Sequence, residues 1–551
     1  MYLRTTKRKN KDGTSVEYYQ LAHNYWNPET KKSVPQVIHS FGRTDKLDID
    51  VLKRLCLSIA KVCGIEIKDT PEEKKQSIPN DVKIIQTFEL GTVMAIESIW
   101  ERLGIGNILR KIVKEKNCKV AYERAIFAMV ANRLCEPDSK FGVWDRWLPK
   151  VYLPSCQELK LDHMYEAMDV MLGESEKIEE EIFFKTANLL NLDVELIFYD
   201  TTTVSFSIDA NDCDEFRKLG HPKEGGWSPQ VVVALAVTKD GLPVRSWVFP
   251  GNTADTKTVE KVKKDLRGWN LSRVIFVGDG GMDSDENRKE LSKGCGKYLL
   301  ATRMGSIKEI KEEVLTRAGK YRKIEENLHA KEVLVGDGES RRRYIVCYNP
   351  NEEERQKEHR VVVLKELKEE LEKHPKKSVT AKWAIELLSS KRYKRYLKIE
   401  NSEISLDKAA IEKAGKYDGK WVLITNDDTL SVEDAAKGYK NLYTIEKCFR
   451  SLKRTQIQMG PVYHRIFERI KAHVKICVMA LLIQRVAEIE CKDTWGEIST
   501  ILEKLQITEF QNKDYKFYQR NELSSKVKEI LKKLGIHLPC NVLAVQKISD
   551  S

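Results

Sequence analysis

The stretch from Val194 to Phe206 reads VELIFYDTTTVSF, and it predicts the strand around which the fold is arranged. Its run from Leu196 to Asp200 is short, apolar and rich in Ile, Phe and Tyr, which is typical of a buried strand. Asp200 is expected near the end of this strand. A carboxylate beside a buried strand is usually paired, hydrogen-bonded or bound to a metal ion. The alternative interpretation is that Asp200 only opens the following turn.

A second apolar run that closes on a carboxylate favours a shared site. The run VIFVGD ends at Asp279. Between the two runs lie two further apolar segments, joined by a turn at residues 239–241, and an amphipathic segment from about Asp255 to Trp269. The turn contains Asp-Gly, which is typical of a β-hairpin. The predicted order is therefore strand, strand, strand, helix, strand.

This order can place the two carboxylates side by side. If the first three strands form an antiparallel meander and the helix crosses over to a parallel fourth strand, the first and fourth strands are neighbours. Asp200 and Asp279 then lie together. Adjacent carboxylates repel unless a cation lies between them, and a hard divalent cation with oxygen ligands is the usual solution.

A third acid lies in the segment GYKNLYTIEKCFRSLKRTQ, residues 438–456. Tyr439, Glu446 and Lys453 recur at intervals of seven, which returns to nearly the same face of a helix. The segment follows the strand-like run WVLIT, which ends at Thr425. The alternative is a surface helix with solvated charges. The tyrosine on the same face favours a functional helix.

With these residues in place, the chain resembles the DDE transposases of bacterial insertion sequences. Asp200, Asp279 and Glu446 correspond to the catalytic triad of that family. The predicted helix resembles the Tyr-x2-Arg-x3-Glu-x6-Lys signature of one large group, although Leu442 stands where that group has Arg. Gly280 also stands where Arg often follows the second acid. Phosphate binding would then fall to another basic residue. The resemblance covers roughly residues 194–489, and it includes GNTADTKT at 251–258 and VGDGGM at 277–282.

The resemblance implies an α/β fold with an RNase H-like catalytic core, a mixed five-stranded sheet with helices. It implies two Mg²⁺ ions, or Mn²⁺ in their place, bound by Asp200, Asp279 and Glu446. The implied activity is nicking of DNA at the element's ends, followed by strand transfer into target DNA. The expected partner is double-stranded DNA, as terminal repeats and as target, with the chain acting as a homodimer. The residues expected to bind DNA phosphates are Tyr439, Lys453, Arg450 and Arg454.

Spacing and composition divide the chain into six parts. The gap between Asp279 and Glu446 is too long for a loop, so an inserted α+β domain is expected there. The polar segment from Lys68 to Val82 is expected to be a linker. The expected parts are an N-terminal basic β element (1–67), a helical domain that could bind the element's ends (84–191), the first part of the core (192–297), the insertion (298–415), the second part of the core with the catalytic helix (416–490) and a C-terminal helical region (491–551).

Two basic segments could contact DNA outside the triad. KRYKRY, residues 391–396, interleaves basic and aromatic side chains, which suits a surface that follows a backbone and stacks bases. A solvated charge run explains it equally well. A loop and long helix after Gly460 could reach a phosphate, or its polar groups could be structural. The candidate contacts are Lys391, Arg392, Lys394, Arg395, His464 and Arg465.

Composition limits the classes of partner and location. The 551 residues are 41% hydrophobic and carry 95 Lys and Arg against 83 Asp and Glu, a net charge of +12 that favours an anionic partner. Twelve Cys without any Cys-x2-Cys pair favour reduced thiols and a cytoplasmic location. No signal peptide is expected at the N-terminus. The longest apolar run, Ile476 to Ile483, is too short to cross a bilayer.

A different class of enzyme shares part of the pattern. FYDTTTV followed by VGDGGMD resembles phosphatases of the haloacid dehalogenase type, in which Asp200 would be the nucleophile and Asp279 with Asp283 would bind Mg²⁺. Thr202 replaces the second Asp of that group's first motif, and a hairpin is expected where that group has alternating β and α units. A third alternative is a catalytically inactive DNA-binding derivative, which the presence of all three acids disfavours.

Overall fold

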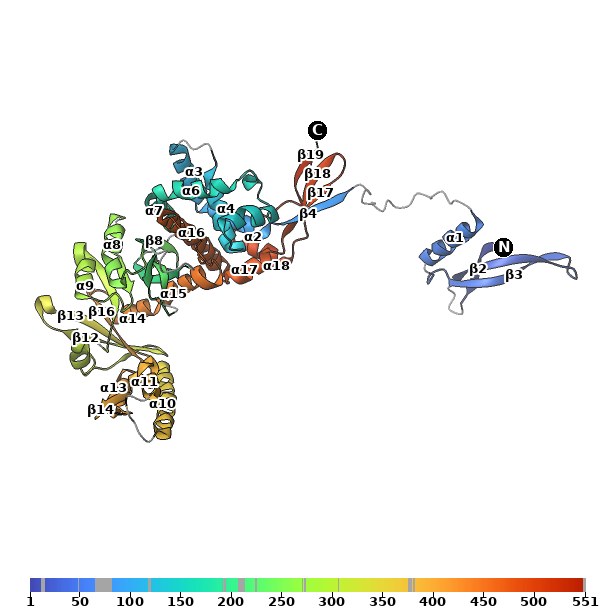
Figure 1. Ribbon diagram of the computed structural model, residues 1–551. Helices are drawn as coiled ribbons and strands as arrows, with labels where there is room; N and C mark the ends of the chain where they lie inside the picture. Colours follow the sequence, from blue (N-terminus) through green and yellow to red (C-terminus); the bar gives the residue numbers. More distant parts are fainter. Residues whose placement is uncertain are drawn as a thin grey trace. The chain divides into compact units, whose positions relative to one another are not determined.

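The computed structural model divides into two compact units, Met1–Val82 and Lys83–Ser551 (Figure 1). The predicted linker from position 68 to position 81 lies outside the described residues. The structure describes the chain apart from residues 11–14, 48, 65–81, 117–119, 191, 193–194, 207–213, 223–224, 270, 272–273, 306, 375–378, 380–381 and 549–551.

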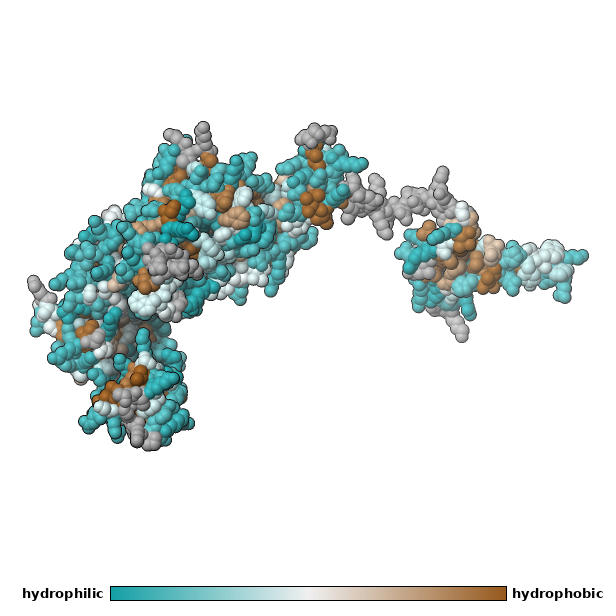
Figure 2. Space-filling view, viewed as in Figure 1, coloured by the Kyte–Doolittle hydropathy of each residue, from teal (hydrophilic) through white to brown (hydrophobic). Residues whose placement is uncertain are grey.

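The N-terminal unit is a three-stranded antiparallel sheet followed by a helix. Its elements are β1 (Tyr2–Lys9), β2 (Ser15–Asn27), β3 (Lys32–Arg43) and α1 (Ile49–Cys63). The sequence predicted a basic β element here but not α1, and it did not assign the basic start of the chain to a strand. That start is strand β1. The charges are tolerated because they have cross-strand partners, such as Glu17 for Lys7 at 2.6 Å. Figure 2 shows a hydrophobic patch on this unit. Leu57 and Val62 of α1 are among its exposed hydrophobic side chains.

The next region is mainly helical, as predicted. Its elements are β4 (Lys83–Glu89), α2 (Gly91–Arg102), α3 (Ile105–Glu115), α4 (Tyr122–Cys135), the single turn α5 (Lys140–Gly142), α6 (Leu161–Gly173) and α7 (Ser175–Leu189). The prediction that helix begins at the start of this region was wrong, because β4 joins a sheet. The partner strands come from the other end of the chain, so local periodicity does not reveal them.

The C-terminal region is mixed α and β, which corrects the prediction of a helical region. It contains α17 (Trp495–Leu502), β17 (Gln506–Gln511), β18 (Tyr515–Arg520), α18 (Ser525–Lys533) and β19 (Val542–Lys547). The sheet has the order β19-β18-β17-β4, with β17 antiparallel to β4. Burial alternates along β17, where Ile507 and Glu509 are buried, but apolar and polar residue types do not alternate in β17 or β18, so the local pattern does not reveal these strands.

The centre of the second unit is a ten-stranded mixed sheet. Its order is β11-β12-β13-β16-β10-β9-β5-β7-β6, with β8 paired to β7. The strands are β5 (Leu196–Ser205), β6 (Lys218–Gly220), β7 (Ser228–Val237), β8 (Pro243–Pro250), β9 (Ile275–Gly278), β10 (Lys297–Thr302), β11 (Arg322–Glu325), β12 (Leu328–Val335), β13 (Arg342–Tyr348) and β16 (Lys420–Thr425). The predicted meander and crossover are confirmed, because β5, β7 and β8 are antiparallel, α8 (Asp255–Gly268) follows, and β9 lies parallel to β5.

The expected sheet of five strands is too small. β10 pairs in parallel with β9 and antiparallel with β16, so the sheet continues into β13, β12 and β11. The expected start of the insertion at position 298 therefore falls inside a strand. The physical reason is that β10 is buried along most of its length, and pairing on both edges satisfies its backbone groups.

A small α+β lobe lies between β13 and β16 in the chain. It consists of α10 (Pro350–Lys373), α11 (Lys382–Ser389), α12 (Lys391–Lys394), β14 (Leu397–Glu400), β15 (Glu403–Leu406) and α13 (Lys408–Tyr417). The lobe has hydrophobic clusters of its own, one of which joins Val363 and Leu367 to Tyr396.

Helices cover both faces of the central sheet. Ile197 and Tyr199 of β5 pack in a cluster with α8 and α9 (Asp285–Ser292), whereas Phe198 belongs to the cluster of the opposite face. That face carries α16 (Phe467–Cys491), which includes the longest apolar run of the chain, Ile476 to Ile483. Because side chains alternate along a strand, Asp200 shares its face with Phe198. Within the described residues, none of the helices has the length and apolar character that a membrane crossing requires.

Candidate active site

The register of two parallel strands brings the first two predicted acids together. β5 and β9 pair from Leu196 with Ile275 to Tyr199 with Gly278, so the next residues along these strands are Asp200 and Asp279. The prediction that Asp200 lies near the end of its strand was wrong. β5 continues to Ser205 because it also pairs with β7, and it is β9 that ends just before Asp279.

Each of these carboxylates is oriented by the backbone that follows it. The Thr201 N–H donates to Asp200 Oδ1 at 2.7 Å, and the Gly280 N–H donates to Asp279 Oδ1 at 2.6 Å. Asp200 is half-buried on the sheet, whereas Asp279 is exposed. The pair therefore combines one group fixed in a central strand with one group open to solvent.

The sequence predicted one continuous helix around the third acid, and this prediction was wrong. The segment forms α14 (Val432–Lys440), α15 (Tyr443–Arg450) and the π-helical turn η8 (Ser451–Thr455). At the first junction the hydrogen bonds tighten to a spacing of three residues, as from the Leu442 N–H to the Tyr439 carbonyl at 2.9 Å. Tyr439, Glu446 and Lys453 therefore lie on three consecutive helical segments.

Tyr439 connects the helical segments to the acid pair. Its hydroxyl donates to Asp279 Oδ1 at 3.4 Å. Burial raises the pKa of Tyr439, and the carboxylates of Asp279, Glu446 and Asp200 raise this pKa further. The hydroxyl therefore stays protonated and can donate at neutral pH. All three acids therefore lie near enough to Tyr439 to act on its hydroxyl.

The donor set is suited to a hard cation. Asp200 and Asp279 are neighbours in register, and carboxylate oxygens are the ligands that divalent cations of the Mg²⁺ type prefer. Within the described part of the chain, no group of three or more His, Cys, Asp or Glu side chains is gathered closely enough to form a ready-made metal site. The chemistry of the residues fits such an ion, and the two adjacent aspartates are its natural ligands.

Two models of known protein families match the chain. Residues 195–483 match the model of the transposase DDE domain, and residues 3–73 match that of the IS1634 family transposase N-terminal domain. The chain belongs to the DDE transposase family. It is therefore an enzyme that acts on DNA, and transposases of this family use divalent metal ions. The resemblance stated from the sequence is confirmed.

Two solved structures also align with the transposase. A piggyBac transposase synaptic complex with hairpin DNA aligns with 9% identity over 80% of this chain and 79% of that chain, with a TM-score of 0.35. A Mos1 transposase paired-end complex with left transposon end aligns with 11% identity over 44% of this chain and 65% of that chain, with a TM-score of 0.13. A search of curated proteins found no match.

The first turn of α8 fastens β5 beside the acid pair. The Thr201 hydroxyl donates to Asp255 Oδ1 at 2.6 Å, and the Tyr199 hydroxyl donates to Thr258 Oγ1 at 2.7 Å. These residues face the side of the sheet opposite to Asp200. Sequence reasoning noted the segment GNTADTKT only as a match, although alternation along β5 indicates that Thr201 faces the crossover helix. Asp255 is thus a positioning residue that the sequence reasoning missed.

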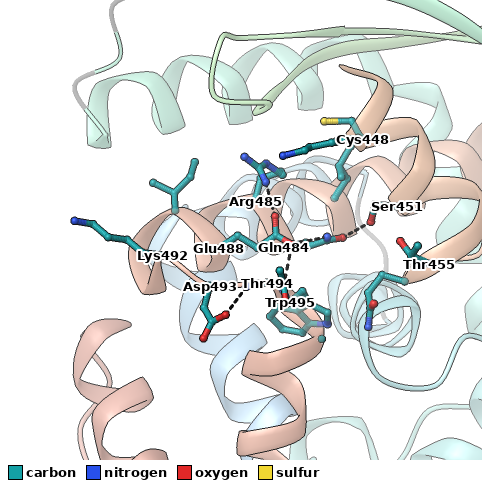
Figure 3. A pocket seen from close by; sticks show the side chains of 15 residues that line it. Cys448, Ser451, Thr455, Gln484, Arg485, Glu488, Lys492, Asp493, Thr494 and Trp495 are labelled. Carbon is teal, nitrogen blue, oxygen red and sulfur yellow. Dashed lines mark hydrogen bonds and ion pairs between the residues drawn. The ribbon is translucent and has the colours of Figure 1, made fainter. Parts of the chain in front are cut away.

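The helical segments α15 and η8 lie opposite α16 and α17. A cavity of about 730 Å³ lies there, and Figure 3 shows its side chains joined in a network. The Ser451 hydroxyl donates to Gln484 Oε1 at 2.5 Å, and Gln484 Nε2 donates to Glu488 Oε1 at 2.8 Å. Glu488 also pairs with Arg485. This network holds η8, which continues α15, against α16, and Glu446 is not among the residues that line the cavity.

Tyr439 lies on α14, and the other predicted phosphate-binding residues lie along α15 and η8. Arg450 and Arg454 are exposed. Lys453 lines a separate cavity of about 330 Å³, together with Thr203 and Ser205 of β5. This cavity therefore adjoins the strand that carries Asp200.

The interpretation of KRYKRY as a base-stacking surface was wrong in its aromatic part. Tyr396 is buried in the core of the lobe, and the Tyr393 hydroxyl donates to Glu366 at 2.9 Å. The rings serve the lobe's own cluster because the lobe is too small to form a core without them. Arg392 pairs with Glu366 at 2.9 Å. The basic side chains remain exposed, and they are Lys391, Arg392, Lys394 and Arg395.

The phosphatase alternative does not fit the structure. The side chain of Asp283 is only 1% exposed and pairs with Arg288 at 2.7 Å, so it is not turned toward Asp279 as a second ligand. β7 and β8 form an antiparallel hairpin where that class of enzyme has alternating β and α units. The family match also favours the transposase.

Arg465 and His464 differ in their surroundings. Arg465 is exposed and open to a ligand. His464 is half-buried, and its ring meets that of Tyr165 edge to face, with centroids 6.2 Å apart. Its neighbour His473, on α16, is buried and contacts the Met459 carbonyl through Nε2 at 2.9 Å.

Acidification is expected to destabilise the transposase through these histidines. Burial lowers the pKa of His464 to about 4 and that of His473 well below its ordinary value of 6.5. From pH 6.5 down to about pH 4, the unfolded chain therefore binds protons that the folded chain excludes, and stability falls as the pH falls. The titratable and charged groups around the two rings are Lys140, Arg133, Arg469, Asp169, Tyr165 and Cys477.

Melting temperatures in phosphate-free buffers measure this dependence. His464→Gln is expected to flatten the decline because glutamine does not titrate, whereas His537→Gln, at an exposed position, should leave it unchanged. A wild-type melting temperature that stays level from pH 7 to pH 5 contradicts the prediction.

Proposed function

We propose that this transposase nicks DNA at the ends of an insertion sequence and transfers the strands into target DNA, with Asp200, Asp279 and Glu446 as its catalytic acids. The observation that carries the proposal is the register of β5 and β9, which makes the two aspartates neighbours. The contact of Tyr439 with Asp279 brings the helical segments of the third acid to the same place.

The core of this enzyme is RNase H-like in the proposal. The five strands β8, β7, β5, β9 and β10 support it, because three antiparallel strands are followed through a helix by two that lie parallel to β5. Strands β16, β13, β12 and β11 then extend the sheet on one side.

Asp200, Asp279 and Glu446 would hold two Mg²⁺ ions, with Mn²⁺ as the alternative. When bound, such ions activate the attacking oxygen and stabilise the leaving oxygen of a phosphodiester. The protein's own residues hold the acids in place. The hydroxyl of Tyr439 donates to Asp279, and the backbone N–H groups that follow both aspartates fix their carboxylates.

Basic residues beside the acids would bind the DNA backbone. Tyr439, Lys453, Arg450 and Arg454 lie on the three helical segments that carry Glu446, and Arg465 lies exposed beyond them. The lobe would add the four basic side chains of residues 391–395. The N-terminal unit and the helical region from position 84 to position 191 would bind the element's ends. Two ends must be joined, so we propose that the enzyme acts as a homodimer on DNA.

The test is cleavage of a labelled duplex that carries the flanking element's end. Wild type with Mg²⁺ should nick the duplex, and chelation of the metal should stop the reaction. Glu446→Gln should reduce the rate by about 10²-fold, comparable to the loss of one transition-state contact. Glu433→Gln is the matched control, because Glu433 is an exposed carboxylate on α14 that pairs with Lys437.

Two results would overturn the proposal. One is nicking by Glu446→Gln at the wild-type rate. The other is release of phosphate from p-nitrophenyl phosphate by wild type and Glu446→Gln equally, with no nicking of the duplex. That pattern would return the chain to the phosphatase class.

A further inference from the structure

A cavity of about 490 Å³ lies between α4, α5, α6, α16 and the loop that follows η8. Three of the four charged side chains in its lining are basic. These charged residues are Arg133, Asp138, Lys140 and Arg146, and two histidines, His464 and His473, line the cavity beside them. None of these residues belongs to the three acids or to the helical segments that carry Tyr439 and Glu446.

Two of the cations are buried without a counter-ion. Arg133 and Lys140 are each only 4% exposed, and neither forms an ion pair with any residue that the structure describes. Nη1 of Arg133 donates to the Gln458 carbonyl at 3.1 Å, but its buried Nε has no hydrogen-bond partner among the described residues. Buried charges are normally paired, and buried polar groups are normally hydrogen-bonded.

Of the two histidines that line this cavity, His473 contacts Lys140 and orients its side chain. His473 Nε2 donates to the Met459 carbonyl at 2.9 Å, so its Nδ1 is the acceptor. Lys140 Nζ lies 3.3 Å from that Nδ1 and donates to it. A neutral imidazole thus holds the ammonium group without neutralising it.

The single carboxylate of the lining is already engaged. Asp138 Oδ2 accepts from Nη2 of Arg146 at 2.6 Å, and Oδ1 accepts from the Ser139 N–H at 2.6 Å. Arg146 and Asp138 therefore neutralise each other at the edge of the cavity. The charges of Arg133 and Lys140 are left for a ligand.

We propose that this cavity is a binding site for a phosphate group, held by Arg133 and Lys140. A phosphate oxygen would accept the unmade hydrogen bond of Arg133 Nε and would bring the missing negative charge to both cations. The two sources of such a group are inorganic phosphate and the 5′-terminal phosphate of a DNA strand. The second source rests on the proposed function.

The position and the surroundings of the cavity fit the chemistry of this ligand. Its volume exceeds that of a phosphate ion, and Tyr463 and Phe141, both exposed, line it where a sugar and base could follow the phosphate. Gly460 lines both this cavity and the one that holds Lys453 and Thr203. A strand that leaves the acids along β5 could therefore reach it.

The protonation of the lysine supports the same conclusion. Burial, and then the nearby charge of Arg133, lower the pKa of Lys140 to about 7. A dianion beside the ammonium would restore its charged form, because an opposite charge favours the ionised state. Phosphate binding should therefore be accompanied by proton uptake near pH 7.

The test uses the full-length protein without divalent metal, so that cleavage plays no part. Calorimetric titration with inorganic phosphate, at constant ionic strength, should show saturable binding, and the melting temperature should rise with it. Lys140→Met and Arg133→Gln should each weaken phosphate binding by at least about tenfold, as loss of a charged hydrogen bond predicts. Lys150→Gln, an exposed lysine paired with Glu136, is the control and should bind as wild type does.

The variants also separate a ligand site from a structural one. A buried cation without a counter-ion should be dispensable to the unliganded fold, so Lys140→Met should melt no lower than wild type when phosphate is absent. Unchanged phosphate affinity in both variants would overturn the proposal, and so would the absence of any binding of phosphate or of 5′-phosphorylated duplex by wild type.

A comparison of two DNA duplexes, one 5′-phosphorylated and one with a 5′-hydroxyl, identifies the source of the phosphate. If the 5′-phosphorylated duplex binds at least about tenfold more tightly than its 5′-hydroxyl form, and Lys140→Met abolishes the preference, the ligand is a strand end. Equal binding of the two duplexes, with saturable inorganic phosphate binding, assigns the free ion. Neither result depends on nicking, so failure of the catalytic proposal would leave this one standing, and the reverse also holds.

Discussion

Replacement of Asp279 by asparagine is expected to slow cleavage of an element-end duplex by about 10³-fold, the upper range for removal of one group that acts on the transition state. The side chain lies just beyond the end of β9, next in register to Asp200, and it accepts from the hydroxyl of Tyr439. The amide would keep an oxygen for the Gly280 N–H, but it would remove the negative charge that a divalent ion requires.

The structure also predicts what should not change in Asp279→Asn. Asp279 is exposed, so the melting temperature should stay within a degree or two of wild type, by the usual range for surface substitutions. Asp285→Asn is the matched control, since Asp285 is an exposed carboxylate in the first turn of α9 that pairs with Arg288. Single-turnover rates at saturating Mg²⁺ measure the effect. Wild-type cleavage by Asp279→Asn would rule out this pair as the reacting centre.

The largest expected effect on stability comes from Glu179→Ala, which should lower the free energy of unfolding by about 3–5 kcal/mol. The side chain of Lys475 on α16 is only 11% exposed, and its Nζ contacts Glu179 Oε2 and the Ser246 carbonyl, both at 2.6 Å. Glu179 Oε1 in turn accepts from the Ser246 hydroxyl at 2.8 Å. One carboxylate thus joins α7, β8 and α16, and its removal leaves a buried cation unpaired.

Equilibrium unfolding in urea measures this loss. The double variant Glu179→Leu with Lys475→Met should recover most of the stability, because replacing both partners of a buried pair by apolar groups is often neutral. A loss below about 1 kcal/mol in the single variant would show that water reaches Lys475 and that the pair is not a stabilising contact. Cleavage should be unaffected by either change at temperatures where the protein is folded.

Local sequence patterns predicted the part of the fold that holds the aspartates. The runs of β5, β7, β8 and β9 and the helix α8 each carry their own periodicity, and the Asp-Gly turn fixes the hairpin. The neighbouring position of Asp200 and Asp279 then follows from topology alone. What could not be predicted depends on partners that are distant in sequence, such as the pairing of β4 with β17 and the extension of the sheet through β10 and β16.

Prediction of the candidate site was limited in the same way, because it also depends on contacts that local sequence does not reveal. The seven-residue repeat brought Tyr439 and Glu446 together but could not reveal the tight turn at Leu442, which depends on backbone hydrogen bonds. Basic and aromatic residues in KRYKRY suggested a surface, yet burial of Tyr396 is decided by the size of the lobe's core. The isolation of Arg133 and Lys140 is visible only once five segments are assembled around them.

The attachment of the lobe has a mechanical consequence. The chain enters the lobe from β13 and leaves it into β16, and these two strands pair with each other. The Asn349 N–H at the start of the lobe donates to the Gly419 carbonyl at its end, at 2.7 Å. β16 pairs with β10, and β10 with β9, which ends at Asp279. A force on the lobe along these strands would act in shear on three strand pairings, β13 with β16, β16 with β10 and β10 with β9, and many hydrogen bonds would share it. Tension in DNA held by the lobe would thus reach the catalytic edge through the stiffest direction of the sheet.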